Sequence, residues 1–398
     1  MFKKILLITI LPATIFLNSC RDAEIQPTDS ESCVLATNDT TAPHPKEAQL
    51  QAVIDKYKKL GLPGISVLVR AENKLFTGSA GYADIDKGTK FTPCTVAKTA
   101  SLTKIMMAAL TMKLVEDGNL QLDEKISKWL DPEMLKKINN AEQATLRSLL
   151  NHTTGIYDVI TDNGFYLAVL NHPDKKWKQE ELLEFVYGKP ADYAYGSTSG
   201  YSNTNTLLVS MIIDKATGRN HADLLKERIF VPLGLNNTFY YWQQDLPKGK
   251  IAQGYYDLYN NQTLVNVSNF NTGSGNGYTG VYSNVLDLQK FIDALFRKKT
   301  LLKQSSLDEM TKFAENMESR KYLGLGIFKD YIDGPFDPAK DYGLGHRGRD
   351  LGYSADMFYF PEHKTTITLL VNYGTDAESA LRPVFLKFKE EIAVAALH

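Results

Sequence analysis

The sequence lacks a strong charge of either sign, and this limits the partners it can bind through electrostatics. Its 398 residues hold 45 Lys and Arg against 46 Asp and Glu, for a formal net charge of −1. No block of like charges stands out, so neither a basic field for nucleic acid nor a charged binding tail is expected. Hydrophobic residues at 43% and charged residues at 23% describe an ordinary globular protein. We therefore expect no nucleic-acid partner.

Long hydrophobic runs are also missing beyond the N-terminus, where no stretch approaches the roughly 20 residues of a membrane-spanning helix. Residues 1–4 form a short basic start, and residues 5–17 form an apolar run of the kind found in secretory signals. Leu17-Asn-Ser-Cys20 resembles a bacterial lipobox, although Asn18 departs from the usual small residue. We expect residues 1–20 to be a lipoprotein signal, with Cys20 as the lipidated residue and a membrane as partner through that anchor. An ordinary signal-peptidase site is the alternative.

Cysteine is scarce, with three residues in the whole chain. If Cys20 carries lipid, Cys33 and Cys94 remain as an even pair in an exported, oxidising setting. A Cys33–Cys94 disulfide is one hypothesis, and two free thiols are the other. Residues 21–45 are polar, rich in Thr, Ser, Asp and Pro, and predict a flexible tether.

Strand patterns occur at both ends of the remaining chain, and helical patterns fill its middle. Helices are predicted over residues 48–60, 101–117, 146–150, 179–186, 204–217, 285–296 and 381–394, and strands over 65–69, 75–82, 353–360 and 365–371. The simplest arrangement is an α/β protein of the α+β type. In it, one mostly antiparallel sheet is flanked by the terminal helices, and a helical lobe is inserted between its halves. We expect one domain over residues 46–398, with a sheet lobe (about 46–118 and 300–398) and a helical lobe (about 119–299).

A candidate nucleophile stands at the start of the first strong helix, in Ser101-Leu-Thr-Lys104. Positions i and i+3 share a helix face, so the Ser101 hydroxyl and the Lys104 amine can come within hydrogen-bond reach. A serine hydroxyl needs a base to take its proton, and a lysine amine serves when burial keeps it neutral. Taken alone, this motif is weak, because a helix N-cap and a surface lysine give the same pattern.

A second candidate is Tyr201-Ser-Asn203, which directly precedes a predicted helix. A phenol can relay protons, and an amide can hold a substrate carbonyl. The same three residues recur in Tyr282-Ser-Asn284, also before a helix, and a turn with a helix cap explains either copy. A third candidate is His346-Arg-Gly348, where His346 would contact the substrate and Gly348 would allow close backbone approach.

In this order, the three motifs resemble those of the penicillin-binding protein and class C β-lactamase superfamily, in its D-alanyl-D-alanine carboxypeptidase and esterase branch. Pro63-Gly-Ile-Ser-Val67 and Leu149-Leu-Asn-His-Thr-Thr-Gly155 match that family too, and the resemblance runs over about residues 50–372. It implies a β-lactamase/transpeptidase-like fold. It also favours Tyr201 and Asn203 over the second triplet, because the family's tyrosine motif follows a glycine-containing loop such as Tyr195-Gly-Ser-Thr-Ser-Gly200.

The resemblance implies a mechanism with an acyl-enzyme and no cofactor or metal. Lys104, with Tyr201, would deprotonate Ser101, and the backbone N–H groups of Ser101 and Arg349 would hold the oxyanion. Tyr201 would protonate the leaving group, and water would then release the acyl group. Arg347 and Arg349 would bind a substrate's terminal carboxylate, as a guanidinium does well, although a surface arginine turn is the alternative.

These motifs favour a D-alanyl-D-alanine carboxypeptidase-like peptidase of the cell envelope, acting on a peptidoglycan-type peptide. A short-chain esterase, a class C-like β-lactamase and a penicillin-binding sensor or scaffold lipoprotein stay open. An α/β-hydrolase is disfavoured, because its G-x-S-x-G elbow has no match with serine at the centre: Thr198 stands there in Gly196-Ser-Thr-Ser-Gly200. A class A β-lactamase is disfavoured because an S-D-N triplet is missing.

Overall fold

The computed structural model describes residue 25 and residues 41–314, 322–331, 337, 339–376 and 378–398. The predicted signal with Cys20, most of the tether, and Cys33 lie outside these residues. Cys94 takes part in a disulfide, and the described residues hold no other cysteine, so the Cys33–Cys94 pairing stays a prediction. None of the described helices combines the length and the apolar character needed to cross a membrane.

Helices and strands alternate unevenly along the chain, with the long strands near its two ends. The helices are α1 (Glu47–Lys59), α2 (Leu102–Glu116), α3 (Pro132–Leu135), α4 (Leu146–Leu150), α5 (Asn163–Asn171), α6 (Gln179–Leu183), α7 (Asn203–Thr217), α8 (His221–Leu225), α9 (Val285–Ile292), α10 (Gln304–Met310) and α11 (Arg382–Leu397). The strands are β1 (Ala42–Pro43), β2 (Gly64–Ala71), β3 (Lys74–Asp84), β4 (Thr89–Lys90), β5 (Ala97–Lys98), β6 (Phe239–Tyr240), β7 (Tyr255–Tyr256), β8 (Val265–Asn266), β9 (Val281–Ser283), β10 (Tyr322–Leu323), β11 (Phe328–Tyr331), β12 (Tyr342–Asp350), β13 (Tyr353–Phe360) and β14 (Thr365–Val371).

The main sheet joins strands from the two ends of the sequence. Its order is β1-β3-β2-β14-β13-β12-β11-β10, with β4 paired to β3. Every pair is antiparallel except β1 with β3. The junction lies between β14 and β2, where Ile367 stands opposite Val69. The predicted mostly antiparallel sheet, built from two distant groups of strands, is confirmed.

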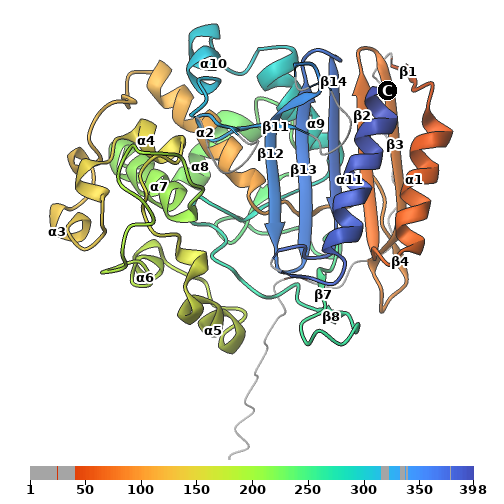
Figure 1. The fold of residues 1–398 in the computed structure, drawn as a ribbon, viewed down its shortest axis with the longest axis horizontal. Helices are drawn as coiled ribbons and strands as arrows, with labels where there is room; N and C mark the ends of the chain where they lie inside the picture. The colour runs from red at the N-terminus through yellow and green to blue at the C-terminus, as the bar shows by residue number, and fades with distance from the viewer. Residues whose placement is uncertain (1–24, 26–40, 315–321, 332–336, 338, 377) are drawn as a thin grey trace, which may run out of the picture.

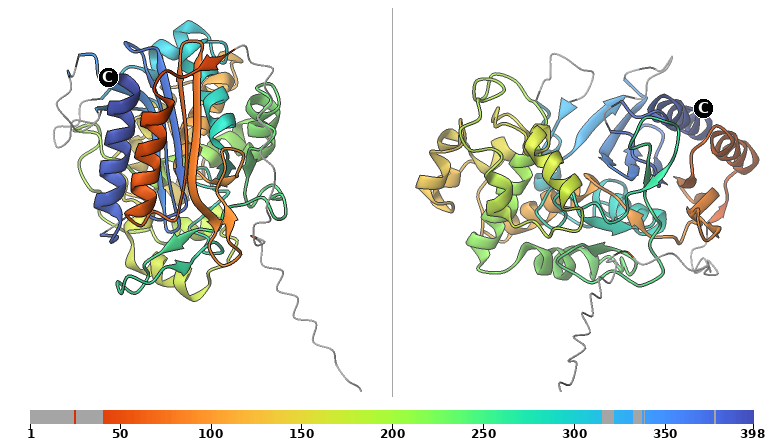
Figure 2. Two further views of the ribbon diagram at one scale, coloured as in Figure 1. Left: turned by 90° about the vertical axis from the view of Figure 1, so that its right-hand side faces the viewer. Right: turned by 90° about the horizontal axis from the view of Figure 1, so that it is seen from below.

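Helices cover both faces of this sheet. On one face, α1 and α11 lie side by side (Figures 1 and 2), and Tyr57 packs against Phe388 with ring centroids 5.4 Å apart. On the other face, α9 packs on β2, β13 and β14, and α2 packs on β12 and β13. Because β14 is covered on both faces, all seven of its residues are buried, which explains its continuous run of apolar and threonine residues.

Two elements differ from the sequence-based expectation. Helix α9 falls within the predicted helical lobe, yet it packs on the sheet through Leu288, Phe291 and Ile292, which are buried in the same core as Leu370 of β14. Strand β12 was not predicted, although it carries the third motif. Its three glycines and three charged residues hide the strand pattern, and its hydrogen bonding to β11 and β13 defines it as a strand.

Helix α2 runs through the centre of the molecule and positions the first motif. It packs against β12 and β13 and also against α7 and α8, so nearly every residue over 102–112 is buried. A helix that is buried all round shows no amphipathic pattern. The rest of the helical region, from α3 to α7, lies beside the sheet in Figure 1.

Candidate active site

The first motif forms a compact pair at the N-terminus of α2. Ser101 is the N-cap residue, and Lys104 Nζ lies 3.0 Å from Ser101 Oγ. Lys104 is 1% exposed, and its Nζ also donates to Asn203 Oδ1 at 2.6 Å and to the Tyr278 carbonyl oxygen at 2.8 Å. A neutral amine has two N–H groups and one lone pair. The two carbonyl-type oxygens engage the two N–H groups, so the lone pair is left to accept the Ser101 proton.

The charge state of Lys104 follows from its surroundings. Burial lowers the pKa of Lys104, while the carboxylates of Asp158, Asp350 and Asp376 act in the opposite direction. Burial is the larger effect, because a charged ammonium loses its hydration there. The neutral form of the lysine is therefore accessible near neutral pH, which is what a general base requires.

Tyr201 faces the same pair from the segment before α7. Tyr201 and Ser101 both line the cavity, Ser101 lies close enough to lower the pKa of the phenol, and Lys104 Nζ lies 5.0 Å from the ring centroid. Burial raises the pKa of Tyr201 well above its usual range. The phenol therefore stays protonated, so Lys104 is the better base and Tyr201 is suited to donate a proton.

Asn203 is held in place by a residue that the sequence-based reasoning did not identify. Asp158 accepts hydrogen bonds from Asn203 N at 2.9 Å and from Asn203 Nδ2 at 3.0 Å. These bonds turn Asn203 Oδ1 toward Lys104. The two residues are 45 positions apart, and no sequence spacing connects them. Asp158 therefore positions the amide that orients the lysine.

Gly348 allows β12 to lie directly against the start of α2. A Cβ atom at this position would fall 2.0 Å from the Thr99 carbonyl oxygen and 3.2 Å from Ser101 N. Any larger residue would push the strand away from the nucleophile. The predicted close backbone approach at Gly348 is present, and it is made to the protein's own backbone.

His346 lies behind Tyr201 and does not line the cavity. It is 1% exposed, its Nδ1 donates to the Arg347 carbonyl oxygen at 2.6 Å, and its ring meets Phe328 edge-on at 4.7 Å. Burial, with the nearby Lys104, lowers the pKa of His346 well below its usual range. The expected direct contact with substrate is therefore not supported. A neutral ring that packs 6.0 Å from the Tyr201 ring instead shapes the wall behind the phenol.

Ser101, Tyr201 and Asn203 line a cavity of about 360 Å³ between the sheet and the helical region. The cavity is large enough for a substrate group of amino-acid size. Its lining combines the catalytic candidates with aromatic and charged side chains. They are Ser101, Ile160, Tyr166, Tyr201, Asn203, Thr272, Tyr278, Thr279, Leu323, Phe328, Arg347, Arg349, Asp350 and Asp376.

A family model described as Beta-lactamase matches residues 50–387, most of the chain. The chain belongs to the beta-lactamase family. Penicillin-binding protein 4* of Bacillus subtilis is 28% identical over 320 residues, which are 76% of this chain and 66% of that protein. Protein flp of Staphylococcus aureus is 25% identical over 83% of this chain and 64% of its own length. The match thus spans somewhat less than two thirds of these relatives.

Solved structures share the fold of this beta-lactamase family member. A D-stereospecific amidohydrolase from a Streptomyces species has a TM-score of 0.75 and 26% identity, covering 86% of this chain and 98% of that one. D-amino acid amidase from Ochrobactrum anthropi has a TM-score of 0.77 and 24% identity, covering 89% and 98%. A penicillin-binding protein from Bacillus halodurans has a TM-score of 0.71 and 22% identity, covering 85% and 98%. The predicted superfamily and fold are confirmed, and with them a serine hydrolase.

The two arginines of the third motif lie in the cavity lining, and each is paired with an acid of a neighbouring strand. Arg349 pairs with Asp356, with Nη1 2.7 Å from Oδ1, and Nη1 also donates to the carbonyl oxygens of Gly348 and Ala355. Arg347 pairs with Asp330. Both line the cavity, and Asp356 is shared with Lys389, whose Nζ lies 3.5 Å from Oδ2. The acids of β11 and β13 compete with a substrate carboxylate for the arginines, and the carboxylate clamp stays a prediction.

Proposed function

We propose that this serine hydrolase cleaves amide bonds of amino-acid derivatives through an acyl-enzyme on Ser101. One observation carries the proposal: the buried Lys104 Nζ lies 3.0 Å from Ser101 Oγ, and Asn203 Oδ1 and the Tyr278 carbonyl oxygen hold it there. A catalytic base must lie within this distance of the proton that it takes. The geometry supports the roles that the motifs predict for both residues.

The proposed reaction runs in two halves. Lys104 Nζ takes the Ser101 proton while Ser101 Oγ bonds to the substrate carbonyl carbon, and the C=O electrons move to the oxyanion. The electrons then return, the carbon–nitrogen bond breaks, and the Tyr201 phenol gives its proton to the leaving nitrogen while it takes up the proton held by Lys104. Both groups are then back in their starting protonation states. A water molecule attacks the acyl-enzyme in the same way and releases the acid and Ser101. Backbone N–H groups of Ser101 and Arg349 remain the predicted oxyanion donors.

For the substrate, a D-amino-acid amidase or peptidase is favoured over the D-alanyl-D-alanine carboxypeptidase that the motifs suggested. The Streptomyces neighbour, at 26% identity, is described as a D-stereospecific amidohydrolase. A carboxypeptidase needs a free cation for the terminal carboxylate of its substrate. In this cavity Arg347 and Arg349 are both paired with acids.

The test is a substrate panel assayed on the wild type, on Ser101→Ala and on Ser305→Ala, an exposed serine outside the cavity. The panel holds D-alanine p-nitroanilide, its L enantiomer, a D-Ala-D-Ala peptide, a nitrophenyl ester and a cephalosporin. We expect the D-anilide to turn over in the wild type and in Ser305→Ala, and activity to vanish in Ser101→Ala. Turnover retained in Ser101→Ala would refute the acyl-enzyme, and a preference for the D-Ala-D-Ala peptide would restore the carboxypeptidase.

We also propose that the enzyme is exported and tethered to a bacterial membrane through lipid on Cys20. The support is the apolar run over residues 5–17 followed by Leu17-Asn-Ser-Cys20. Expression of the full chain with radiolabelled palmitate should label the wild type and not Cys20→Ser. Equal labelling of both, or none of either, would refute the anchor.

A further inference from the structure

The charged residues that line the cavity are partnered unevenly. Asp350 forms an ion pair with Lys98 at 2.8 Å and accepts two hydrogen bonds from Thr272 Oγ1, and both arginines are paired with acids. Asp376 is different. Within the part of the chain that the structure describes, no cation lies in ion-pair contact with its carboxylate. The cavity thus keeps one acid that is not neutralised.

The surroundings of Asp376 leave its charge poorly compensated. Burial and then the nearby Asp350 carboxylate raise the pKa of Asp376, and the opposing influence of Arg349, Arg382 and Lys104 is smaller. A carboxylate in such a position gains most from a cation that enters the cavity. Because Asp376 lines the cavity, that cation can belong to a substrate.

We propose that Asp376 binds the free α-ammonium group of an amino-acid amide or short peptide substrate. This inference rests on the proposed function, and it names the substrate class. A cavity of about 360 Å³ holds one residue-sized group, so an ammonium one carbon away from the scissile carbonyl stays within it. A carboxylate-ended substrate meets repulsion from the same acid. Specificity for aminoacyl compounds then depends on Asp376 rather than on Ser101 or Lys104.

The test compares D-alanine p-nitroanilide with its N-acetyl form, which has no charge. Asp376→Asn should lower kcat/KM for the free amine by about 10- to 100-fold, the usual size of a lost charge-assisted hydrogen bond. Because Asp376 also raises the pKa of Lys104, each variant is compared on the pH plateau of its own kcat/KM profile, and there kcat/KM for the acetylated anilide should change much less than kcat/KM for the free amine. Asp245→Asn, an exposed acid outside the cavity, is the control and should alter neither substrate.

The outcomes separate the two proposals. Equal effects of Asp376→Asn on both anilides, or no effect on either, would overturn the ammonium site while leaving Ser101 catalysis intact. If the wild type turns over neither anilide yet hydrolyses the nitrophenyl ester in a Ser101-dependent way, the amide proposal fails. The same variants on an ester of D-alanine, with and without N-acetylation, then test Asp376 by itself.

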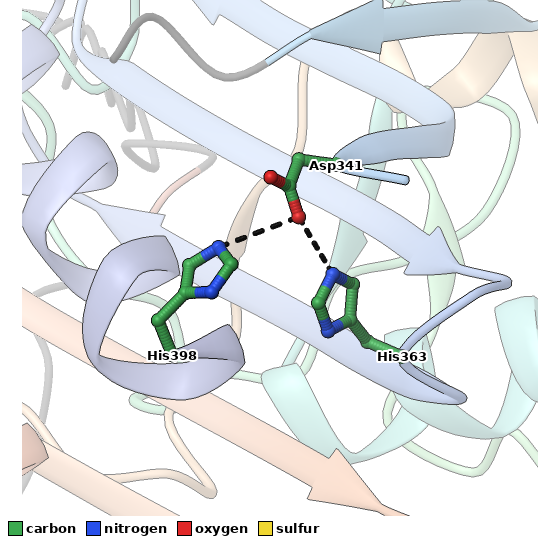
Figure 3. Close-up of side chains that lie close together, drawn as sticks. All are labelled: Asp341, His363 and His398. Carbon is green, nitrogen blue, oxygen red and sulfur yellow. Dashed lines mark hydrogen bonds and ion pairs between the residues drawn. The ribbon is translucent and has the colours of Figure 1, made fainter. Parts of the chain in front are cut away.

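A second inference comes from a different observation at the far end of β12. Asp341, His363 and His398 bring one carboxylate and two imidazoles together (Figure 3). Asp341 Oδ1 lies 2.7 Å from His363 Nε2 and 3.3 Å from His398 Nε2. The three residues come from the start of β12, the turn between β13 and β14, and the end of α11. None of them lines the catalytic cavity.

The spacing matches the coordination shell of a small divalent cation. Bonds of about 2.0 Å in a tetrahedral zinc site place ligand atoms about 3.3 Å apart. His398 already has this separation from Asp341, and His363 needs to withdraw by a few tenths of an ångström, which its partly exposed turn allows. The other oxygen of Asp341 accepts a hydrogen bond from Asp337 N at 2.8 Å, which fixes the buried carboxylate as a ligand.

We propose that Asp341, His363 and His398 bind a Zn²⁺ ion that ties the end of α11 to the β13–β14 turn. Two imidazoles and one carboxylate, with water in the fourth position, are a ligand set that zinc accepts. Gly348, near the opposite end of β12, contacts Ser101, so the metal site and the nucleophile lie at opposite ends of one strand. The site therefore acts on stability and takes no part in the reaction.

Isothermal titration calorimetry with ZnCl₂ on the chelator-treated protein tests this site. The wild type should bind one equivalent of Zn²⁺ and melt at a higher temperature with the metal. His363→Ala and His398→Ala should each lose at least tenfold in affinity, while His172→Ala, an exposed histidine elsewhere, should match the wild type. Absence of binding by the wild type, or equal affinity in all four proteins, would overturn the proposal. Unchanged anilide hydrolysis in the two variants should confirm their folding.

Discussion

Two segments of this protein have the same three residues and entirely different surroundings. Tyr201-Ser-Asn203 lies at the cavity, where Asn203 accepts a hydrogen bond from Lys104 and Tyr201 lines the same wall as Ser101. Tyr282-Ser-Asn284 lies in the core. There Tyr282 sits on β9 and packs edge-on against Tyr241 and Tyr353.

The asparagines show the difference most clearly. Asn203 Oδ1 faces the catalytic lysine because Asp158 holds the amide nitrogen. Asn284 Oδ1 accepts from Asp287 N at 2.9 Å and caps α9, so its role is to satisfy a helix terminus. Identical local sequences therefore give a reactive group in one place and a structural cap in the other. Their long-range neighbours make the distinction.

Substitution of Tyr201 and of Tyr282 by phenylalanine should give the largest difference in activity between the two segments. Tyr201→Phe removes the proton donor and should lower kcat by about 10²- to 10⁴-fold, the usual contribution of a general acid or base. Tyr282→Phe keeps its ring in the core and should leave kcat unchanged. Steady-state kinetics with D-alanine p-nitroanilide measure both. Similar losses in the two variants would mean that the phenol of Tyr201 takes no part in the chemistry.

Alanine at each asparagine should give the next largest contrast. Asn203→Ala frees the Lys104 amine to move, and misplaced catalytic groups cost about 100-fold in kcat/KM. Asp158→Ala should lower kcat/KM by a similar factor, because the Asp158 carboxylate orients Asn203 and the variant lacks it. Asn284→Ala should keep the wild-type kcat/KM. Activity in Asn203→Ala within a few-fold of the wild type would show that Lys104 is held by other contacts.

Substitution of each asparagine by aspartate should distinguish the two asparagines through the pH dependence of kcat/KM. Lys104 acts when neutral, so kcat/KM should rise with pH and level off below pH 10.5, the ordinary lysine value, because burial lowers the pKa of Lys104. Asn203→Asp adds a carboxylate beside the Lys104 ammonium and so raises the pKa of Lys104. The rise of kcat/KM should therefore shift to higher pH by about one unit or more. Asn284→Asp should leave it in place. An unshifted profile in Asn203→Asp would exclude Lys104 as the titrating base.

The smallest expected effect is on stability, and here the substitution at Asn284 is the one that should have a consequence. Asn284→Ala removes the cap of α9 and should lower the free energy of unfolding by about 1 kcal/mol, whereas Asn284→Asp restores a capping oxygen. Urea denaturation followed by circular dichroism measures both. If Asn284→Ala is as stable as the wild type, water or a neighbouring group caps the helix instead.

Much of the fold was predictable, because its long elements carry strong local patterns. The hairpin over residues 353–360 and 365–371 and the helices around α1, α2, α7 and α11 appear close to their predicted bounds. Strand β12 was missed, since Gly345, Gly348 and three charged residues interrupt its pattern. Its neighbours β11 and β13 define it, and those contacts are not local in sequence.

The site was predictable to the same degree. Ser101, Lys104, Tyr201 and Asn203 do meet, and the glycine-containing loop before Tyr201 was sufficient to select this triplet over the second one. The structure places His346 outside the cavity lining and pairs the Arg349 side chain with Asp356 across the β12–β13 strand pair, and no short motif signals either arrangement. Asp158 and Asp376 had no recognisable motif at all.

The sequence by itself determined the family and the reactive groups, because short motifs identify them. It also determined the main helices and strands, because hydrophobic periodicity predicts them. Only the tertiary structure decided which charges remain available. It pairs Arg349 with Asp356 and Asp350 with Lys98, and it leaves Asp376 in the cavity. Ion pairing depends on distances of a few ångströms between side chains on different elements, and a linear sequence does not encode such distances in any local pattern.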